Sequence, residues 1–352
     1  MNLSETKSLA KPFSHIYVED DAFNYPLSKE ILGRLKDSHI IKIKHYKDIF
    51  NRAGQDFLLQ KQSRSLILSV NRNEKIYPGA RVCQSFGNDN FYYTSNIMNC
   101  VFDCEYCYLQ GMYPSGNIVI FVNYDDYFSE IEKFLAKHDM YICISYDTDL
   151  LAMENLTGFV DKWIRFTLSH PSLKIEIRTK SAFDTSCFPK CDRVIFAWTL
   201  SPEYIIERFE HFTPSLDSRI NAVKKAIDGD YMVRLCFDPM IYVKDYKEIY
   251  KDFYEYVFSQ IDGNKITDAS LGLFRISSSY IKSMKKKRLT EISAYPYTCL
   301  EGVCQYEPKK SGEMLDFAGY EITKTVKFCD WSYSAAESEI TKYISREKLF
   351  ID

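Results

Sequence analysis

The chain has 352 residues, of which 46% are hydrophobic and 26% are charged. This balance is typical of a globular protein of about two domains of roughly 150 residues each, and it excludes extensive disorder. Lysine and arginine together number 45, and aspartate and glutamate 48, which gives a formal net charge of −3. That charge excludes the chain-wide positive potential of histone-like proteins, so contact with nucleic acid has to come from a local basic face.

The sequence carries no membrane or export signal. No apolar run approaches the roughly 18 residues of a membrane-spanning helix, and the start, MNLSETKSLAKPF, lacks the apolar core of a secretory signal. The cysteines number 11, and an odd count without an export signal argues against a disulfide framework. We therefore expect a cytoplasmic protein with no membrane partner, whose thiolates act as ligands or reactants.

Secondary structure is predicted from periodicity and capping residues. Residues 1–90 are expected to form a mixed α/β region with a helix over Pro26–Leu35, capped by Ser28, and a strand over Ser65–Val70. From about residue 91, strand-length apolar runs alternate with helical segments. The expected strands are Phe91–Ser95, Tyr141–Tyr146, Leu173–Thr179, Arg193–Leu200, Met232–Phe237 and Ala269–Ile276. The expected helices are Tyr124–Lys137, Leu156–Leu168, Ser215 to Gly229, and Asp245–Ile261.

Strands with helices in most of the gaps predict an α/β fold with a parallel sheet. Periodicity does not decide between a doubly wound sheet and a barrel. The predicted division is an N-terminal mixed region over 1–90, a parallel-sheet domain over 91–280 and a C-terminal extension over 281–352. The extension opens on a basic run in which five of the seven residues from Lys282 to Arg288 are cations.

Three cysteines follow the first strand of the predicted sheet. Cys100, Cys104 and Cys107 are spaced C-x3-C-x2-C. Such a loop can wrap one face of a [4Fe–4S] cube, and three thiolates leave one iron open for a molecule with an amine and a carboxylate, such as S-adenosylmethionine. A structural zinc site, which needs a fourth Cys or His ligand, and an incidental group of thiols are the alternatives. The pairs Cys187/Cys191 and Cys299/Cys304 are interpreted as structural.

The cysteine loop also resembles a known family. With Tyr106 before the third cysteine, its spacing resembles the signature of the radical S-adenosylmethionine superfamily. The run Cys104-Glu-Tyr-Cys107-Tyr-Leu-Gln resembles the spore photoproduct lyase family, whose loop ends in Tyr-Cys-Tyr-Leu-Gln. Weaker similarity extends over about residues 15–275. The resemblance implies that the sheet is a partial (β/α)6 barrel of the TIM type, flanked by the N-terminal region and the C-terminal extension.

The resemblance assigns roles to particular residues. It implies that Cys100, Cys104 and Cys107 bind the cluster. Four residues are implied to bind S-adenosylmethionine, namely Tyr106 beside the adenine, Lys180 at the carboxylate, Ser201, and Thr148 in a polar turn. These residues lie in the cysteine loop or after predicted strands, and barrel active sites assemble at the carboxyl ends of the strands. The alternatives are a surface lysine that ends a strand for Lys180 and a turn-forming serine for Ser201.

The family reaction is repair of 5-thyminyl-5,6-dihydrothymine, the spore photoproduct, to two thymines. A 5′-deoxyadenosyl radical takes a hydrogen from the dihydrothymine ring, the bridging C–C bond breaks, and the thymine radical regains a hydrogen. Many members use a cysteine after the second strand as the donor, but here that position is Tyr146. We expect Cys83 to serve instead, with Cys143, Tyr146 or no thiol as alternatives, because strand alternation directs Cys143 away from the face of Tyr146. Tyr106, Tyr108 and Tyr146 are candidates for relaying hydrogen atoms.

Two partners follow from the resemblance. One is UV-damaged DNA, from which the lesion has to be extruded, with phosphate contacts expected from Lys285, Lys286, Lys287 and Arg288. For these cations a solvated surface run is the alternative. The other partner is a low-potential electron donor such as flavodoxin or ferredoxin. Two rival functions remain, a related radical enzyme acting on a peptide or small molecule, and a non-enzymatic zinc or iron–sulfur protein.

Overall fold

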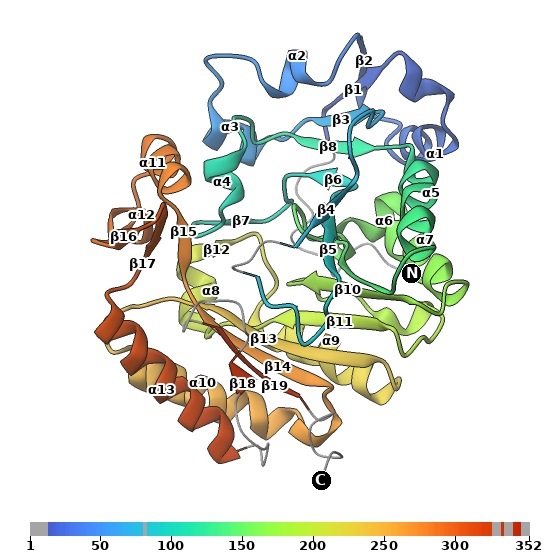
Figure 1. Ribbon diagram of the computed structural model, residues 1–352. Helices are drawn as coiled ribbons and strands as arrows, with labels where there is room; N and C mark the ends of the chain where they lie inside the picture. The colour runs from blue at the N-terminus through green and yellow to red at the C-terminus, as the bar shows by residue number, and fades with distance from the viewer. Residues whose placement is uncertain (1–12, 80–82, 326–331, 334–340, 346–352) are drawn as a thin grey trace.

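The computed structural model describes residues 13–79, 83–325, 332–333 and 341–345. Two large sheets with surrounding helices make up most of it (Figure 1). The first sheet has the order β2 (His39–Ile43), β1 (His15–Glu19), β3 (Leu66–Ser69), β8 (Ile118–Phe121), β6 (Ile97–Met98). Its strands come from both sides of residue 90. Among the described residues, no helix combines the length and apolarity needed to cross a membrane.

The second sheet contains six strands in sequential order, each parallel to the next. They are β5 (Phe91–Thr94), β9 (Met140–Cys143), β10 (Leu173–Thr179), β11 (Val194–Thr199), β13 (Met232–Met240) and β14 (Asp268–Leu273). Every residue of β9, β11 and β14 is buried, as expected for parallel strands that are covered on both faces. The predicted α/β class with a parallel sheet is confirmed. Antiparallel strands flank the six, with β4 (Ile76–Pro78) on one side and β19 (Thr341–Ser345) and β18 (Ser332–Tyr333) on the other.

Helices connect most of the parallel strands, as predicted. The connecting helices are α5 (Tyr124–Leu135), α7 (Phe159–Leu168), α9 (Leu216–Asp228) and α10 (Tyr246–Gln260). Ser215 caps α9 by accepting a hydrogen bond from the Ser218 amide. The other helices are α1 (Pro26–Arg34), α2 (Lys47–Phe50), α3 (Phe57–Gln62), α4 (Leu109–Met112), α6 (Glu154–Thr157), α8 (Glu203–Phe209), α11 (Ser278–Lys287), α12 (Glu291–Ala294) and α13 (Pro308–Thr325), with 3-10 turns η1 (Asp21–Asn24), η2 (Leu151–Met153), η3 (Thr185–Cys187) and η4 (Gly263–Lys265).

Two local expectations are corrected by the structure. Helix α1 begins after Tyr25 with Pro26 in its first turn, and Ser28 is buried inside the helix, so Ser28 is not the cap. Proline suits this position because its missing N–H would have no helical partner there. Strand β9 ends at Cys143, three residues before the predicted end at Tyr146. Strands β1, β2, β6 and β8 of the first sheet were not predicted from the sequence.

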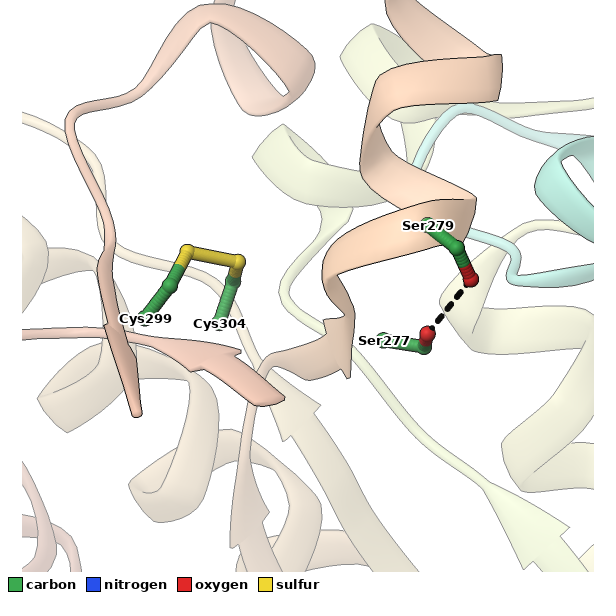
Figure 2. The surroundings of a disulfide bond; sticks show 4 residues. All are labelled: Ser277, Ser279, Cys299 and Cys304. Carbon is green, nitrogen blue, oxygen red and sulfur yellow. Dashed lines mark hydrogen bonds between the residues drawn. A yellow bond between two sulfur atoms is a disulfide. The ribbon is translucent and has the colours of Figure 1, made fainter. Parts of the chain in front are cut away.

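One cysteine pair departs from the expectation of free thiols. Cys299 and Cys304 form a disulfide between β16 (Thr298–Leu300) and β17 (Val303–Gln305), which pair with β15 (Arg275–Ser277) in a small sheet (Figure 2). The two cysteines are direct cross-strand partners. Glu301 and Gly302 both have left-handed backbones, with φ of 46° and 83°, as a two-residue type I′ hairpin requires. This tight turn, unrecognised in the sequence, brings the thiols together.

Candidate active site

A cavity of about 570 Å³ lies at the carboxyl ends of the parallel strands. Tyr93 of β5, Thr179 of β10 and Thr199 of β11 line it. Most of the predicted site residues also line it, namely Cys83, Cys100, Cys104, Tyr106, Cys107, Tyr108, Cys143, Tyr146, Thr148 and Lys180. Ser201 and the basic run Lys285–Arg288 are not part of its wall.

The cysteine loop is held by backbone pairing. Its short strand β7 (Asp103–Cys104) is antiparallel to β12 (Glu210–His211), with Cys104 opposite Glu210. The Glu105 amide donates to the Phe209 carbonyl at 2.8 Å, and the His211 Nε2 lies 2.8 Å from the Glu105 carboxylate. These contacts hold the cysteine loop against β12.

The three thiols suit a cluster. Burial raises the pKa of Cys107 to about 11 and that of Cys104 well above its ordinary value, so metal loading has to displace protons. In the part of the chain that the structure describes, no three Cys, His, Asp or Glu side chains are close enough to hold a single ion. Thiolates that bind separate corners of a cube need not converge on one point. The three cysteines all line the cavity, so the residues present fit a cluster that they would hold there.

Lys180 and Thr148 supply polar groups beside the thiols. The Lys180 amide donates to Asp149 Oδ2 at 2.6 Å, and Thr179 Oγ1 donates to Asp149 Oδ1 at 2.8 Å, which fixes the end of β10. The Lys180 Nζ lies 5.5 Å from the centroid of the Tyr106 ring. Thr148 Oγ1 is buried and has no hydrogen-bond partner among the described residues. An ammonium and an unpartnered hydroxyl on the wall fit a ligand with a carboxylate, such as S-adenosylmethionine.

A buried carboxylate, Glu210, connects two predicted cofactor residues. It accepts hydrogen bonds from the Tyr106 hydroxyl and, at 2.9 Å, from Ser201 Oγ, and it pairs with Arg219. Ser201 therefore supports Tyr106 through Glu210. Burial alone would raise the pKa of Glu210, but the charges of Arg219 and Lys180 hold it at about 2. Sequence analysis missed Glu210 because no local pattern marks it.

The Glu210 pair predicts a pH-dependent contribution to stability. Its pKa is depressed from the ordinary 4.5 to about 2, so the stabilisation is complete above pH 4.5 and is lost as the pH falls through about 2. Glu210→Gln leaves Arg219 buried and unpaired, which should cost about 3–5 kcal/mol at neutral pH. Denaturant unfolding measured across pH should show that the difference in the free energy of unfolding between wild type and variant narrows below pH 4.5. A difference that stays constant with pH would contradict the depressed pKa of Glu210.

Cys83 lies beside a row of tyrosine side chains on the cavity wall. Its Sγ lies 3.8 Å from the Tyr146 hydroxyl. The Tyr146 ring stacks on Tyr93 with centroids 4.0 Å apart, and the Tyr108 ring centroid is 5.9 Å away. Tyr108 donates to the Tyr146 carbonyl at 2.7 Å. Burial raises the pKa of Cys83, which keeps it as the S–H form that hydrogen-atom transfer needs.

The expected opposition of Cys143 and Tyr146 is wrong, because both side chains line the same cavity. Strict alternation holds only within a strand. Strand β9 ends at Cys143, and Ser145 then forms an isolated bridge with Ser95. The chain between Cys143 and Tyr146 is therefore not extended strand, and alternation does not apply.

The predicted basic run divides into two parts. Lys285 and Lys286 are exposed on α11. Lys287 Nζ instead donates to the Gln110 carbonyl at 2.6 Å and also to the Tyr113 carbonyl, and Arg288 pairs with Asp103 inside the cysteine loop. Lys287 and Arg288 thus contact the cysteine loop and the helix after it, and both are only partly exposed.

Comparisons with known proteins agree with this geometry. The family model described as spore photoproduct lyase matches residues 12–314. The chain belongs to the spore photoproduct lyase family. This confirms the resemblance drawn from the cysteine loop.

The individual relatives have low sequence identity to this chain but align with it over most of their length. The chain is 23% identical to a spore photoproduct lyase of Geobacillus sp. (strain Y412MC61) over 348 residues, 96% of each chain. It is 22% identical to that of Bacillus subtilis (strain 168) over 306 residues, 81% of this chain and 83% of the relative. A solved spore photoproduct lyase complexed with dinucleoside spore photoproduct superimposes with a TM-score of 0.77 at 20% identity, over 90% of this chain and 97% of that one. A mutant with bound AdoMet and dinucleoside spore photoproduct gives 0.76 at 21% identity, with the same coverage.

Proposed function

We propose that this protein is a radical S-adenosylmethionine lyase that repairs the spore photoproduct in DNA. The supporting observation is that one cavity gathers the cysteine loop, Lys180, Thr148 and the Cys83–Tyr146 pair at the carboxyl ends of parallel strands. The family match over residues 12–314 supplies the reaction. The complex of a relative with dinucleoside spore photoproduct supports the substrate.

The cysteine loop and its neighbours would hold the cofactors. Cys100, Cys104 and Cys107 bind a [4Fe–4S] cluster, and Lys180, Thr148 and Tyr106 bind S-adenosylmethionine, with Ser201 behind Tyr106. When bound, the two cofactors supply a 5′-deoxyadenosyl radical that abstracts hydrogen from the lesion. The aromatic wall of Tyr93, Tyr108 and Tyr146 provides stacking surfaces for bases.

Cys83 returns the hydrogen atom in this proposal. After the bridging C–C bond breaks, a thymine radical takes hydrogen from the Cys83 thiol, which leaves a sulfur radical. The Tyr146 hydroxyl, 3.8 Å from that sulfur, would pass a hydrogen atom to it and become a tyrosyl radical. Tyr146 would regain a hydrogen atom through the neighbouring Tyr108 from 5′-deoxyadenosine, which carries the hydrogen taken from the lesion. Cys143, the other thiol on the wall outside the cysteine loop, is the alternative donor.

We further infer that the six parallel strands form a partial (β/α)6 barrel. Their sequential order and connecting helices support this topology. Arg234 of β13 also contacts Tyr141 of β9 across the two strands between them, with Nη1 2.6 Å from the hydroxyl.

UV-damaged DNA is the proposed partner, with a flavodoxin or ferredoxin as electron donor and the cytoplasm as the location. The exposed lysines Lys285 and Lys286 are the candidate phosphate contacts, since Lys287 and Arg288 are engaged with the cysteine loop. The proposed regions remain 1–90, 91–280 and the extension 281–352, parts of which lie outside the described residues.

Removing both exposed lysines should weaken DNA binding in a salt-dependent way. For Lys285→Ala/Lys286→Ala, we expect the negative slope of log affinity against log salt concentration to become shallower by about 1.8. Each phosphate contact contributes about 0.9 to the steepness of this slope. Fluorescence anisotropy with duplex DNA between low and physiological salt measures this slope. The control is Lys247→Ala/Lys251→Ala, which removes two exposed lysines from α10. Equal slopes in the two double variants would exclude the α11 contact.

Lesion turnover by the reconstituted protein tests the proposed function. Anaerobic protein with cluster, S-adenosylmethionine and a strong reductant should convert the dinucleoside lesion to thymine products. Omission of any one component should stop the conversion. Cleavage of S-adenosylmethionine without lesion repair would instead favour a related radical enzyme with a peptide or small-molecule substrate.

A further inference from the structure

A buried lysine supports the cysteine loop from outside the cavity. Lys61 lies on α3, and its residue is only 4% exposed. Its Nζ donates to Asn99 Oδ1 at 3.2 Å, the Cys100 carbonyl at 3.0 Å and the Phe102 carbonyl at 3.1 Å. An ammonium group has three N–H donors, and each finds an acceptor here. This complete set of partners is what a buried positive charge requires.

Asn99 links Lys61 to the first cysteine of the loop by hydrogen bonds. Its backbone is left-handed, with φ of 74°, directly before Cys100. Asn99 Nδ2 donates to the Ser115 carbonyl at 2.8 Å and to the Asn117 carbonyl at 3.0 Å. Its Oδ1 accepts from both Lys61 and the Cys100 amide. Lys61 and Asn99 together fix the direction in which the chain enters the cysteine loop.

A second cation contacts the same loop. From α11, Arg288 pairs with Asp103. In Figure 1, α11 lies beside α4, although the two helices are distant in sequence.

The placement of positive charge has a consequence for reduction. One-electron reduction adds a negative charge to a centre that already carries the thiolates of Cys100, Cys104 and Cys107. A buried cation stabilises the more negative, reduced form more than the oxidised form, and low solvent exposure strengthens the effect. The chain's cations therefore bear on how readily a cluster at this loop accepts an electron.

We propose that Lys61 is a positioning residue that fixes the cysteine loop and raises the reduction potential of its cluster. This inference rests on the proposed function, because it requires the cluster. Lys61 does not line the cavity, so it does not contact the substrate. Its effect passes through the backbone carbonyls of Cys100 and Phe102 and through its charge.

The test compares cluster potentials in matched variants after anaerobic reconstitution. Lys61→Gln removes the charge, Lys61→Arg keeps it, and Lys162→Gln is the control. Lys162 Nζ also contacts two backbone carbonyls, those of Thr157 and Gly158 at 3.4 Å, but outside the cysteine loop. Iron content, circular dichroism and a redox titration followed by electron paramagnetic resonance are measured for each.

At the wild-type midpoint, Lys61→Gln should show at least a tenfold lower ratio of reduced to oxidised cluster, about 59 mV for one electron. Lys61→Arg should recover most of this loss, and Lys162→Gln should match wild type. A folded Lys61→Gln protein with wild-type iron content and potential overturns the inference. Should Lys61→Gln fail to fold, Lys61→Met, which also removes the charge, carries the test, with the same negative shift expected and an unchanged potential overturning the inference. Wild-type protein without a cluster would instead overturn the proposed function.

Discussion

A Cys104→Ala variant is expected to lose its cluster and, with it, reductive cleavage of S-adenosylmethionine. Cys104 lies on β7 opposite Glu210, and its residue is only 6% exposed, so no solvent ligand can easily replace the missing thiolate. Loss of a ligand should exceed the 10–100-fold effect of losing a partner behind a ligand. We therefore expect cleavage to fall by more than about 100-fold, measured as 5′-deoxyadenosine formed per protein chain.

The control for this result is Cys191→Ala. Cys191 is a free, partly exposed thiol that is not part of the cavity wall. Its removal should leave both iron content and cleavage unchanged. Wild-type iron content and cleavage in Cys104→Ala would show that Cys104 is not a ligand.

A Cys83→Ala variant should separate cofactor cleavage from product formation. Cleavage needs the cysteine loop and should continue, whereas the thymine radical loses its hydrogen donor. We expect the yield of repaired thymine per 5′-deoxyadenosine to fall by about tenfold, equivalent to about 1.4 kcal/mol in the competition between fates of the radical. Chromatography of all thymine products after a single anaerobic incubation measures both quantities.

Two companion variants make the Cys83 result specific. Cys83→Ser keeps a polar atom near Tyr146 but offers an O–H bond, which is stronger than S–H, so it should resemble Cys83→Ala. Cys143→Ala removes the other candidate thiol on the same wall and should leave the yield unchanged. A full yield in Cys83→Ala together with a reduced yield in Cys143→Ala would transfer the donor role to Cys143.

The strand pattern and the cysteine spacing were sufficient to predict the main elements of the fold. Strand β11 is a continuous apolar run, and β10 alternates apolar with polar residues. The carboxyl end of β10 places Lys180 on the same cavity wall as the cysteine loop. Prediction failed where geometry departed from regular periodicity. The path after Cys143 is one such place, and the hairpin turn at Glu301 and Gly302 is another.

The polar supports of the site could not be predicted from local sequence. Glu210 reaches Tyr106 across 104 positions in the chain, and Lys61 reaches Cys100 across 39. A single lysine on a short helix has the pattern of an exposed residue, and only the folded chain shows that Lys61 is buried. The same holds for Arg288, whose basic neighbours suggest a surface, although its side chain pairs with Asp103.

Isotope transfer from the lesion is the most direct measurement of the central claim. A dinucleoside spore photoproduct deuterated at the abstracted dihydrothymine position is incubated anaerobically with reconstituted protein, S-adenosylmethionine and reductant. Mass spectrometry should find deuterium in 5′-deoxyadenosine and repaired thymine in the same sample. Unlabelled 5′-deoxyadenosine beside intact lesion would contradict repair by this chain.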